Sequence, residues 1–216
     1  MVTEMADPAA FITAHLPLKQ VPGRPDLALH TAVPQSGVWR LSDDGAPPYW
    51  AWPWAGGLAL AQHLGAHPKS VAGRTVIDLG TGSGLVAIAA ARAGASGVTA
   101  IDCDPLATVA ARLNAAHNGV DLDIVCADPL DGPLAKADLV LVGDLFYETA
   151  LATRVTAYLD RYLALGTTIL VGDIGRAALP GARLETLSVW PVPDFGDGAS
   201  APARSAHVFA YRPHSG

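Results

Sequence analysis

A glycine-rich turn follows an apolar stretch that ends in an acidic residue, and this combination could hold a small polar ligand. Residues 76–79 are apolar except for Asp78, and glycines follow at alternate positions, Gly80, Gly82 and Gly84. Glycines let the backbone approach a ligand closely, and a helix predicted over 84–93 would direct its N-terminus at the same place. The Asp78 carboxylate would repel a pyrophosphate but can accept hydrogen bonds from an ammonium group.

The spacing of these glycines separates the turn from the dinucleotide-binding fingerprint. That fingerprint has glycines at its first, third and sixth positions. Here they fall at the first, third and fifth positions, and Leu85 occupies the sixth. The spacing therefore argues against a dehydrogenase that binds a nicotinamide dinucleotide.

Acidic residues recur at or near the ends of successive predicted strands: Asp78, Asp102, Asp128, Asp144 and Asp173. Ligands of open α/β sheets bind beyond the carboxyl ends of the strands, so these side chains would meet at one rim of the sheet. A single aspartate is more often a turn former or a helix cap, which is the role we expect for Asp104 before Pro105. Their recurrence along one rim favours a ligand site.

Strand and helix patterns alternate from residue 74 onward. We expect strands at 74–78, 98–102, 122–126, 137–143 and 167–172, separated by helices except between the third and fourth strands. Two further strands, 184–192 and 205–211, follow one another with no helix between them. Alternation predicts a parallel α/β sheet with right-handed crossovers, and the terminal hairpin makes the last strand antiparallel.

Residues 1–46 are rich in turn formers and are predicted to be an N-terminal arm, whereas 47–216 should form one domain. Asp7 can cap a short helix that begins at Pro8. Segments 27–31 and 37–41 have the composition of an edge hairpin.

Three tryptophans, Trp50, Trp52 and Trp54, lie within five positions. Large aromatic side chains usually anchor a core, but this density beside prolines and Gly56-Gly57 suggests that at least one ring lines a ligand pocket.

Composition limits the other functions. The chain has 216 residues, 50% of them hydrophobic, and a net charge of −6 without a cluster of Lys or Arg, which argues against a nucleic-acid partner. The sequence has neither an apolar run long enough for a membrane span nor a signal-peptide pattern, so we expect a cytoplasmic protein.

Two cysteines, Cys103 and Cys126, are expected to be buried. His63 and His67 lack a third ligand, so no metal site is expected.

Four stretches make the chain similar to the class I, seven-β-strand methyltransferases, which use S-adenosylmethionine. They are Asp-Leu-Gly-Thr-Gly-Ser-Gly (78–84), Ala-Ile-Asp-Cys-Asp-Pro (100–105), Leu-Asn-Ala (113–115) and Gly-Asp-Leu-Phe-Tyr (143–147). The tryptophan stretch, with Pro-Pro-Tyr-Trp-Ala and Trp-Ala-Gly-Gly-Leu-Ala-Leu-Ala (47–61), and Gly-Asp-Ile-Gly-Arg with Leu-Pro (172–180) narrow the resemblance. These stretches resemble the lysine methyltransferases that modify the β-subunit of electron-transfer flavoprotein.

The resemblance implies a Rossmann-like, doubly wound sheet with seven strands in the order 3-2-1-4-5-7-6. It also implies a set of residues that bind S-adenosylmethionine: Trp54, Asp78, Gly80, Thr81, Gly82, Ser83, Gly84, Asp102, Cys103, Asp128 and Asp144. Asp78 and the backbone N–H groups of the turn would hold the methionine part, Asp102 the ribose and Asp128 the adenine. Trp54 would close the pocket near the methionine end.

The same resemblance implies that Asp144, Phe146 and Tyr147 face a lysine of a protein acceptor, and it points to the β-subunit of electron-transfer flavoprotein as that acceptor. An unperturbed lysine amine has a pKa near 10.4 and must lose a proton before it attacks. Asp144 would raise that pKa, so its expected role is to orient the amine and not to act as a strong base. Phe146 and Tyr147 could instead simply pack at a helix start.

Two alternatives stay open: a small-molecule N-methyltransferase on the same fold, and a binding module without catalysis. The acidic segment 194–198 could add to a surface for a basic target.

Overall fold

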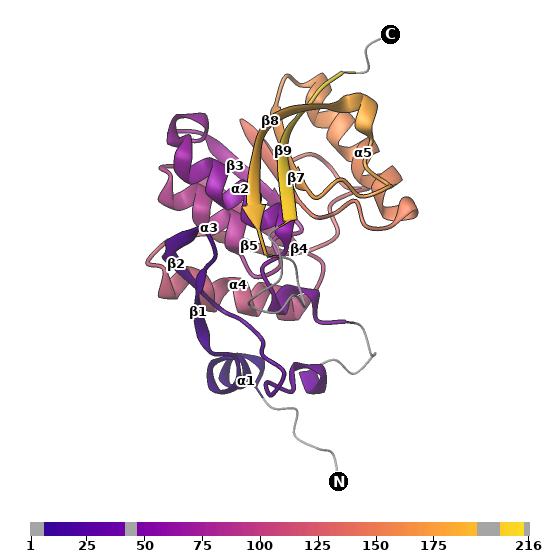
Figure 1. Cartoon of the computed structure of the whole chain (residues 1–216). Coiled ribbons are helices and arrows are strands. Elements are labelled where there is room, and N and C mark those ends of the chain that lie inside the picture. The colour runs from indigo at the N-terminus through magenta and orange to yellow at the C-terminus, as the bar shows by residue number, and fades with distance from the viewer. Residues whose placement is uncertain (1–6, 42–46, 194–203, 214–216) are drawn as a thin grey trace.

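The computed structural model describes residues 7–41, 47–193 and 204–213, and its centre is one seven-stranded sheet (Figure 1). The strands are β3 (Thr75–Leu79), β4 (Gly97–Asp102), β5 (Asp123–Cys126), β6 (Leu139–Gly143), β7 (Thr168–Asp173), β8 (Leu184–Val192) and β9 (Arg204–Tyr211). Their order across the sheet is β5-β4-β3-β6-β7-β9-β8. The central strands are parallel, and β9 runs antiparallel to both β7 and β8. The predicted order 3-2-1-4-5-7-6 and the antiparallel last strand are therefore confirmed.

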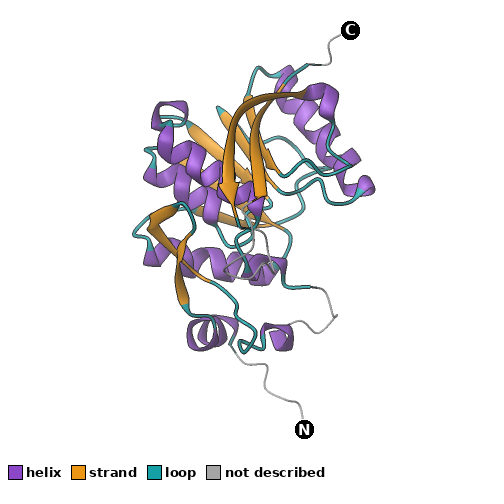
Figure 2. Cartoon of the chain, in the orientation of Figure 1, coloured by secondary structure: helices purple, strands orange, loops and turns teal. Residues whose placement is uncertain are grey.

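Helices cover both faces of this sheet (Figure 2). Helices α2 (Ala55–Ala66) and α3 (Leu85–Arg92) pack on one face, and α5 (Thr149–Ala164) packs on the other. Helix α4 (Pro105–His117) packs beside α3 and against β4 and β5. Strand β6 is apolar without a break because alternate side chains enter the two cores, and both faces of a central parallel strand are buried.

The N-terminal arm contains α1 (Pro8–His15), β1 (Leu18–Val21), β2 (Arg24–His30) and the short 3-10 helix η1 (Val38–Leu41), and a second 3-10 helix, η2 (Tyr49–Ala51), lies between the arm and α2. Asp7 caps α1 as expected, since its side chain accepts a hydrogen bond from Ala9 N–H. The predicted hairpin of 27–31 with 37–41 is wrong. Strand β2 pairs with β1 through the Pro22-Gly23 turn, where proline and a glycine with φ 74° suit a tight two-residue connection.

The arm docks on α4 through an apolar cluster and two asparagines. Ile12 and Leu16 of the arm and Trp50 of η2 are buried in this cluster with residues of α4. Asn114 of α4 and Asn118, which directly follows α4, hydrogen-bond the backbone of β2. The predicted boundary at residue 46 adjoins residues 42–46, outside the described part of the chain, so the division into arm and domain stays a prediction.

Glycines let the N-terminus of α2 lie directly on the carboxyl ends of β6 and β7. A Cβ atom on Gly56 would collide with the carbonyl group of Gly172, and one on Gly143 would lie 3.3 Å from Gly57 Cα. This backbone-to-backbone packing brings the first turn of α2 to the rim where the strand-end acids lie.

Among the described residues, no helix is both long enough and apolar enough to cross a membrane.

Candidate active site

The glycine turn joins β3 to α3 at the rim of the sheet. Gly84 is the N-cap residue of α3 with φ 84°, a conformation that disfavours any side chain. The N–H groups of Gly80 and Thr81 both donate to the carbonyl of Ile101, at 2.9 Å, and that of Gly84 donates to the Thr81 carbonyl, at 2.8 Å. These three donors are thus paired within the chain, and the predicted contact of the turn with a ligand stays a prediction. The three glycines of the turn leave its backbone open to close approach at alternate positions.

Asp78 lies inside β3 and is 1% exposed. One of its carboxylate oxygens accepts hydrogen bonds from the Thr81 hydroxyl (2.6 Å) and from Ala87 N–H (3.0 Å) in the first turn of α3. Burial raises the pKa of Asp78 to about 7, although both hydrogen bonds oppose this rise. Asp78 therefore fixes the shape of the turn and caps α3, and its predicted contact with a ligand stays a prediction.

Asp102 ends β4 and lies beside the turn. Its two oxygens accept hydrogen bonds from Gly82 N–H (2.8 Å) and Asp104 N–H (3.0 Å), and burial raises its pKa. The next residue, Cys103, is exposed at the rim, and so is Cys126 at the end of the edge strand β5. The expectation that both cysteines are buried is wrong, because strand ends at the rim of the sheet remain open to solvent.

Asp128 lies on the surface beyond β5. Its side chain is 46% exposed and forms an ion pair with Arg154 of α5, at 2.9 Å. A hydrogen bond from Leu130 N–H and then the nearby Arg154 lower its pKa. Asp128 thus ties the segment after β5 to α5, and its predicted contact with adenine stays a prediction.

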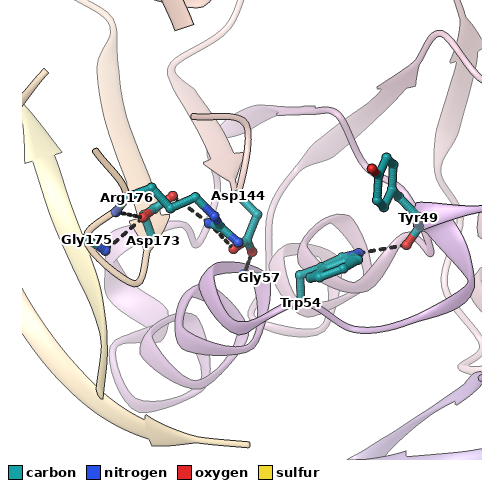
Figure 3. A network of polar contacts seen from close by, with 7 residues as sticks. All are labelled: Tyr49, Trp54, Gly57, Asp144, Asp173, Gly175 and Arg176. Carbon is teal, nitrogen blue, oxygen red and sulfur yellow. Dashed lines mark hydrogen bonds and ion pairs between the residues drawn. The ribbon is translucent and has the colours of Figure 1, made fainter. Parts of the chain in front are cut away.

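Asp144 follows β6 and is held from two sides (Figure 3). One carboxylate oxygen accepts a hydrogen bond from Gly57 N–H at 2.8 Å, in the first turn of α2. The other accepts one from Nη1 of Arg176 at 2.7 Å. Among the described residues, Asp144 is the only non-glycine residue with a positive φ, 58°. Its burial raises its pKa, and the guanidinium of Arg176 opposes that rise.

Asp173, the last residue of β7, is fully buried and holds the same arginine. One oxygen accepts hydrogen bonds from Gly175 N–H (2.8 Å) and Arg176 N–H (2.9 Å), and the other binds Arg176 Nη1 at 2.7 Å. A single guanidinium nitrogen therefore bridges two buried carboxylates. Figure 3 shows the Arg176 side chain reaching from Asp173 to Asp144, whose carboxylate meets α2 at Gly57.

Aromatic side chains lie on the other side of the α2 N-terminus. Trp54, the N-cap residue of α2, donates from its indole nitrogen to the Tyr49 carbonyl at 2.7 Å. The Tyr49 ring stands edge-on to Trp54, with centroids 5.8 Å apart, and lies 6.1 Å from the ring of Tyr147. Tyr49 is 52% exposed and Tyr147 is 55% exposed, so their rings are open to a partner. Trp54 is thus the tryptophan at the rim, whereas Trp50 is 3% exposed in the core.

Phe146 does not reach this rim. It is fully buried in the core between the sheet and α5, with Val140, Val142 and Tyr158 among its cluster. The structure thus places Phe146 in the core, which agrees with the packing alternative considered above, and its predicted role at the acceptor stays a prediction.

Comparison with known proteins identifies the family. The chain is 38% identical to the electron transfer flavoprotein beta subunit lysine methyltransferase of Xenopus laevis over 180 residues, which are 81% of this chain and 73% of that protein. The chain belongs to this methyltransferase family. The rat relative is also 38% identical, over 166 residues, and the match spans 65% of its length. The chain therefore covers slightly less than two thirds of that relative.

Other comparisons agree with a methyltransferase fold. A family model described as ribosomal protein L11 methyltransferase (PrmA) matches residues 62–150. The crystal structure of ribosomal protein L11 methylase from Lactobacillus delbrueckii subsp. bulgaricus has a TM-score of 0.51 and 26% identity, covering 71% of this chain and 77% of that chain. TrmN from Thermus thermophilus, with a TM-score of 0.53 and 24% identity over 72% of this chain and 48% of its own, shows the fold alone.

The sequence analysis assigned no role to two residues of this candidate site, Arg176 and Tyr49. Both lie in stretches that carried the family resemblance, 172–180 and 47–61. The spacing of Asp173 and Arg176, three residues apart at a strand end, was the available signal for their ion pair. The sequence held no such signal for Tyr49, because its ring contacts with Trp54 and Tyr147 depend on the tertiary fold.

The His63–His67 pair of this family member lies away from the rim. The two rings stack with centroids 4.5 Å apart, and His63 Nδ1 lies 2.8 Å from the Ser188 hydroxyl. Burial, followed by the nearby His67, lowers the pKa of His63 to about 4. In residues 7–41, 47–193 and 204–213, no three or more His, Cys, Asp or Glu side chains are grouped so that they could hold a metal ion.

Proposed function

We propose that this chain transfers a methyl group from S-adenosylmethionine to a lysine side chain of a protein, with the β-subunit of electron-transfer flavoprotein as the first candidate acceptor. The observation that carries the proposal is the 38% identity over 180 residues to a lysine methyltransferase named for that subunit. The matched relatives from rat, mouse and human carry the same name.

The chemistry of the side chains at the rim fits S-adenosylmethionine. The carboxylates of Asp78 and Asp102 and the Trp54 ring suit a ligand that carries cationic and hydroxyl groups, and they disfavour a polyphosphate. We propose that Asp102 binds the ribose, Asp128 the adenine, and the glycine turn with Asp78 the methionine part, with Cys103 adjoining. When bound, S-adenosylmethionine supplies a methyl group that its sulfonium charge already activates. The chain is left with positioning and with exclusion of water.

The acceptor side of the site is formed by Asp144 and by the rings of Tyr147, Tyr49 and Trp54. Because both carboxylate oxygens of Asp144 are held, by Gly57 N–H and by Arg176, this carboxylate has a fixed direction. It is suited to accept a hydrogen bond from an amine and to orient it. The aromatic rings can contact the apolar stem of a lysine and, through their faces, its cationic head.

The exposure of this side favours a protein acceptor over a small molecule. Tyr49 and Tyr147 are 52% and 55% exposed, and a small-molecule site would be expected to enclose its ligand. We further propose that the N-terminal arm, 1–46, forms one unit with the methyltransferase domain, 47–216. We also propose that the protein works in the cytoplasm without a nucleic-acid or membrane partner, which its two free thiols and its net charge of −6 support. Segment 194–198, suggested above as a substrate surface, lies outside the described residues.

The test is labelled methyl transfer in a lysate of the same organism. The protein is incubated with the lysate and methyl-labelled S-adenosylmethionine, and proteins are then separated from small molecules. Label in one protein band, found on lysine after digestion, is the expected result. Label only in the small-molecule fraction would instead indicate the small-molecule methyltransferase, and no label despite a thermal shift with S-adenosylmethionine would indicate a binding module.

A further inference from the structure

The acceptor side of the site contains a compact group of three charges. Asp144 comes from the end of β6, Asp173 from the end of β7, and Arg176 from the loop after β7. The side chains of all three are at most 20% exposed. With both acids ionised, the group carries one net negative charge.

We propose that Arg176 is a positioning residue for the methyl acceptor, which fixes the Asp144 carboxylate and limits the negative charge that the acceptor amine meets. This inference rests on the proposed function and deepens it, because it assigns the control of the amine to a residue outside the predicted site.

The positioning part follows from the contacts of Asp144. Its backbone has φ 58°, a conformation that aspartate tolerates but that few residues adopt. Gly57 N–H and Arg176 Nη1 engage different oxygens of the carboxylate, at 2.8 and 2.7 Å, so rotation of the carboxylate would break one of the two contacts. Without Arg176, a buried carboxylate would keep only the backbone partner, and a buried charge without its counterion is strongly unfavourable.

The charge part concerns the proton that the amine must lose. A lysine that enters beside Asp144 is an ammonium ion at neutral pH, and nearby negative charge stabilises that unreactive form. Asp144 and Asp173 together would hold the ammonium strongly. Arg176 cancels one of the two charges, so the site still attracts the ammonium but holds its proton less firmly. His207 on β9 is the cross-strand partner of Asp173 and is the titratable group that faces this cluster from β9. The ionisable groups around the neighbouring Tyr147 ring are Tyr49, Asp102, Cys103 and Glu148.

A purely structural role for Arg176 gives a different expectation. The loop after β7 is already held by the hydrogen bonds of Gly175 and Arg176 N–H groups to Asp173. If the arginine only supported this loop, its loss would lower turnover by the same factor at every pH. If it sets the charge next to the amine, its loss must also move the pH at which turnover rises.

The test measures kcat against pH with the β-subunit of electron-transfer flavoprotein and S-adenosylmethionine both saturating, since this profile reports groups in the bound complex. We compare Arg176→Gln, Arg176→Lys and Asp173→Asn with the wild type. Arg212→Gln is the matched control: it removes the same charge from an exposed ion pair with Glu185, whose side chains are 54% and 59% exposed.

Arg176→Gln and Asp173→Asn should move the acidic limb of the profile in opposite directions. Arg176→Gln leaves two negative charges beside the amine, so the limb should shift upward, on the order of one pH unit. Asp173→Asn leaves Asp144 and Arg176 with no net charge, so the limb should shift downward. Arg176→Lys should restore the position of the limb, with reduced kcat because lysine lacks the planar fork. Arg212→Gln should leave the limb in place.

The inference would be overturned, while the proposed function stands, if the acidic limb of the kcat profile does not move in Arg176→Gln and Asp173→Asn and kcat falls by the same factor at every pH. If Arg176→Gln does not fold, the direction of the shift in Asp173→Asn decides alone, since asparagine retains an oxygen for the two backbone N–H groups. If the wild type transfers no methyl group to lysine in this subunit or in any lysate protein, the proposed function fails, and the inference fails with it.

Discussion

Adding one methyl group at Gly56 should disrupt the contact that brings α2 to the strand ends. A Cβ atom there would collide with the Gly172 carbonyl and would lie 2.7 Å from an Asp144 carboxylate oxygen. Both neighbours are fixed, one by the backbone of β7 and the other by its hydrogen bonds, so the clash cannot be relieved by a flexible side chain. Gly57 is the matched control, since a Cβ atom there would meet its nearest neighbour, Val86 Cγ2, at an ordinary 3.7 Å.

The magnitude follows from two opposing effects. Overpacking typically costs about 1–3 kcal/mol and more against fixed backbone, whereas replacing glycine by alanine in a helix gains up to about 1 kcal/mol. We therefore expect Gly56→Ala to lose at least about 2 kcal/mol of unfolding free energy. For a domain of this size that corresponds to a fall in Tm of roughly 4–8 °C. Gly57→Ala should be neutral or slightly more stable than the wild type.

Urea unfolding and thermal melting of the two variants provide the assay. The difference between the variants matters more than either value alone, because both replacements change the unfolded chain in the same way. Equal stabilities of Gly56→Ala and Gly57→Ala, or a Gly56→Ala variant as stable as the wild type, would refute the reasoning that backbone contact between α2 and β7 builds the rim.

Three further predictions concern the turn, the arm and the aromatic rim. Burial raises the pKa of Asp78 from 3.8 to about 7, so between about pH 4 and 7 the folded wild type binds more protons than the unfolded chain and its unfolding free energy falls as pH rises. Asp78→Asn should abolish this fall. Parallel curves of stability against pH for the two proteins would contradict the prediction. Asn114→Ala should cost about 2–3 kcal/mol and speed amide exchange in both β2 and the glycine turn, because its buried amide joins the His30 N–H to the Ser83 carbonyl, at 2.8 Å each. The Asn118 side chain binds β2 but not the turn, so Asn118→Ala should speed amide exchange in the arm only. The same exchange pattern in both variants would argue against a link from β2 to the turn through Asn114. Tyr49→Ala should raise KM for the protein acceptor several-fold without changing the affinity for S-adenosylmethionine. The control Trp39→Ala, which replaces a side chain that is 58% exposed, should change neither quantity. Equal KM values for Tyr49→Ala and the wild type would show that Tyr49 does not contact the acceptor.

The sheet could be predicted from the sequence almost completely, because its hydrophobic pattern is periodic and local. Each strand from β3 to β9 lies within two residues of its expected bounds at either end. The arm was harder to predict because its short segments carry few periodic positions. There the strong local signal was the Pro22-Gly23 turn, which pairs β2 with β1, and not the β-like composition of 37–41.

Side-chain roles could be predicted less well, since they depend on contacts between distant segments. The strand-end acids do gather at one rim, yet each is already engaged: Asp78 with α3, Asp102 with the turn, and Asp144 with α2 and Arg176. Spacing alone cannot show that a carboxylate is shared between a ligand and the protein's own backbone. Phe146 illustrates the same limit, because it is buried in the core whereas its neighbour Tyr147 is 55% exposed.

The most direct test of the central claim is the intact mass of purified electron-transfer flavoprotein β-subunit after incubation with the protein and S-adenosylmethionine. We expect mass increments of methyl groups located on lysine. Turnover should be strongly reduced in Asp144→Asn, while the affinity of this variant for S-adenosylmethionine is largely retained. An unchanged mass with the wild type would contradict the claim for this acceptor. Wild-type turnover by Asp144→Asn would contradict the assignment of Asp144 to the acceptor.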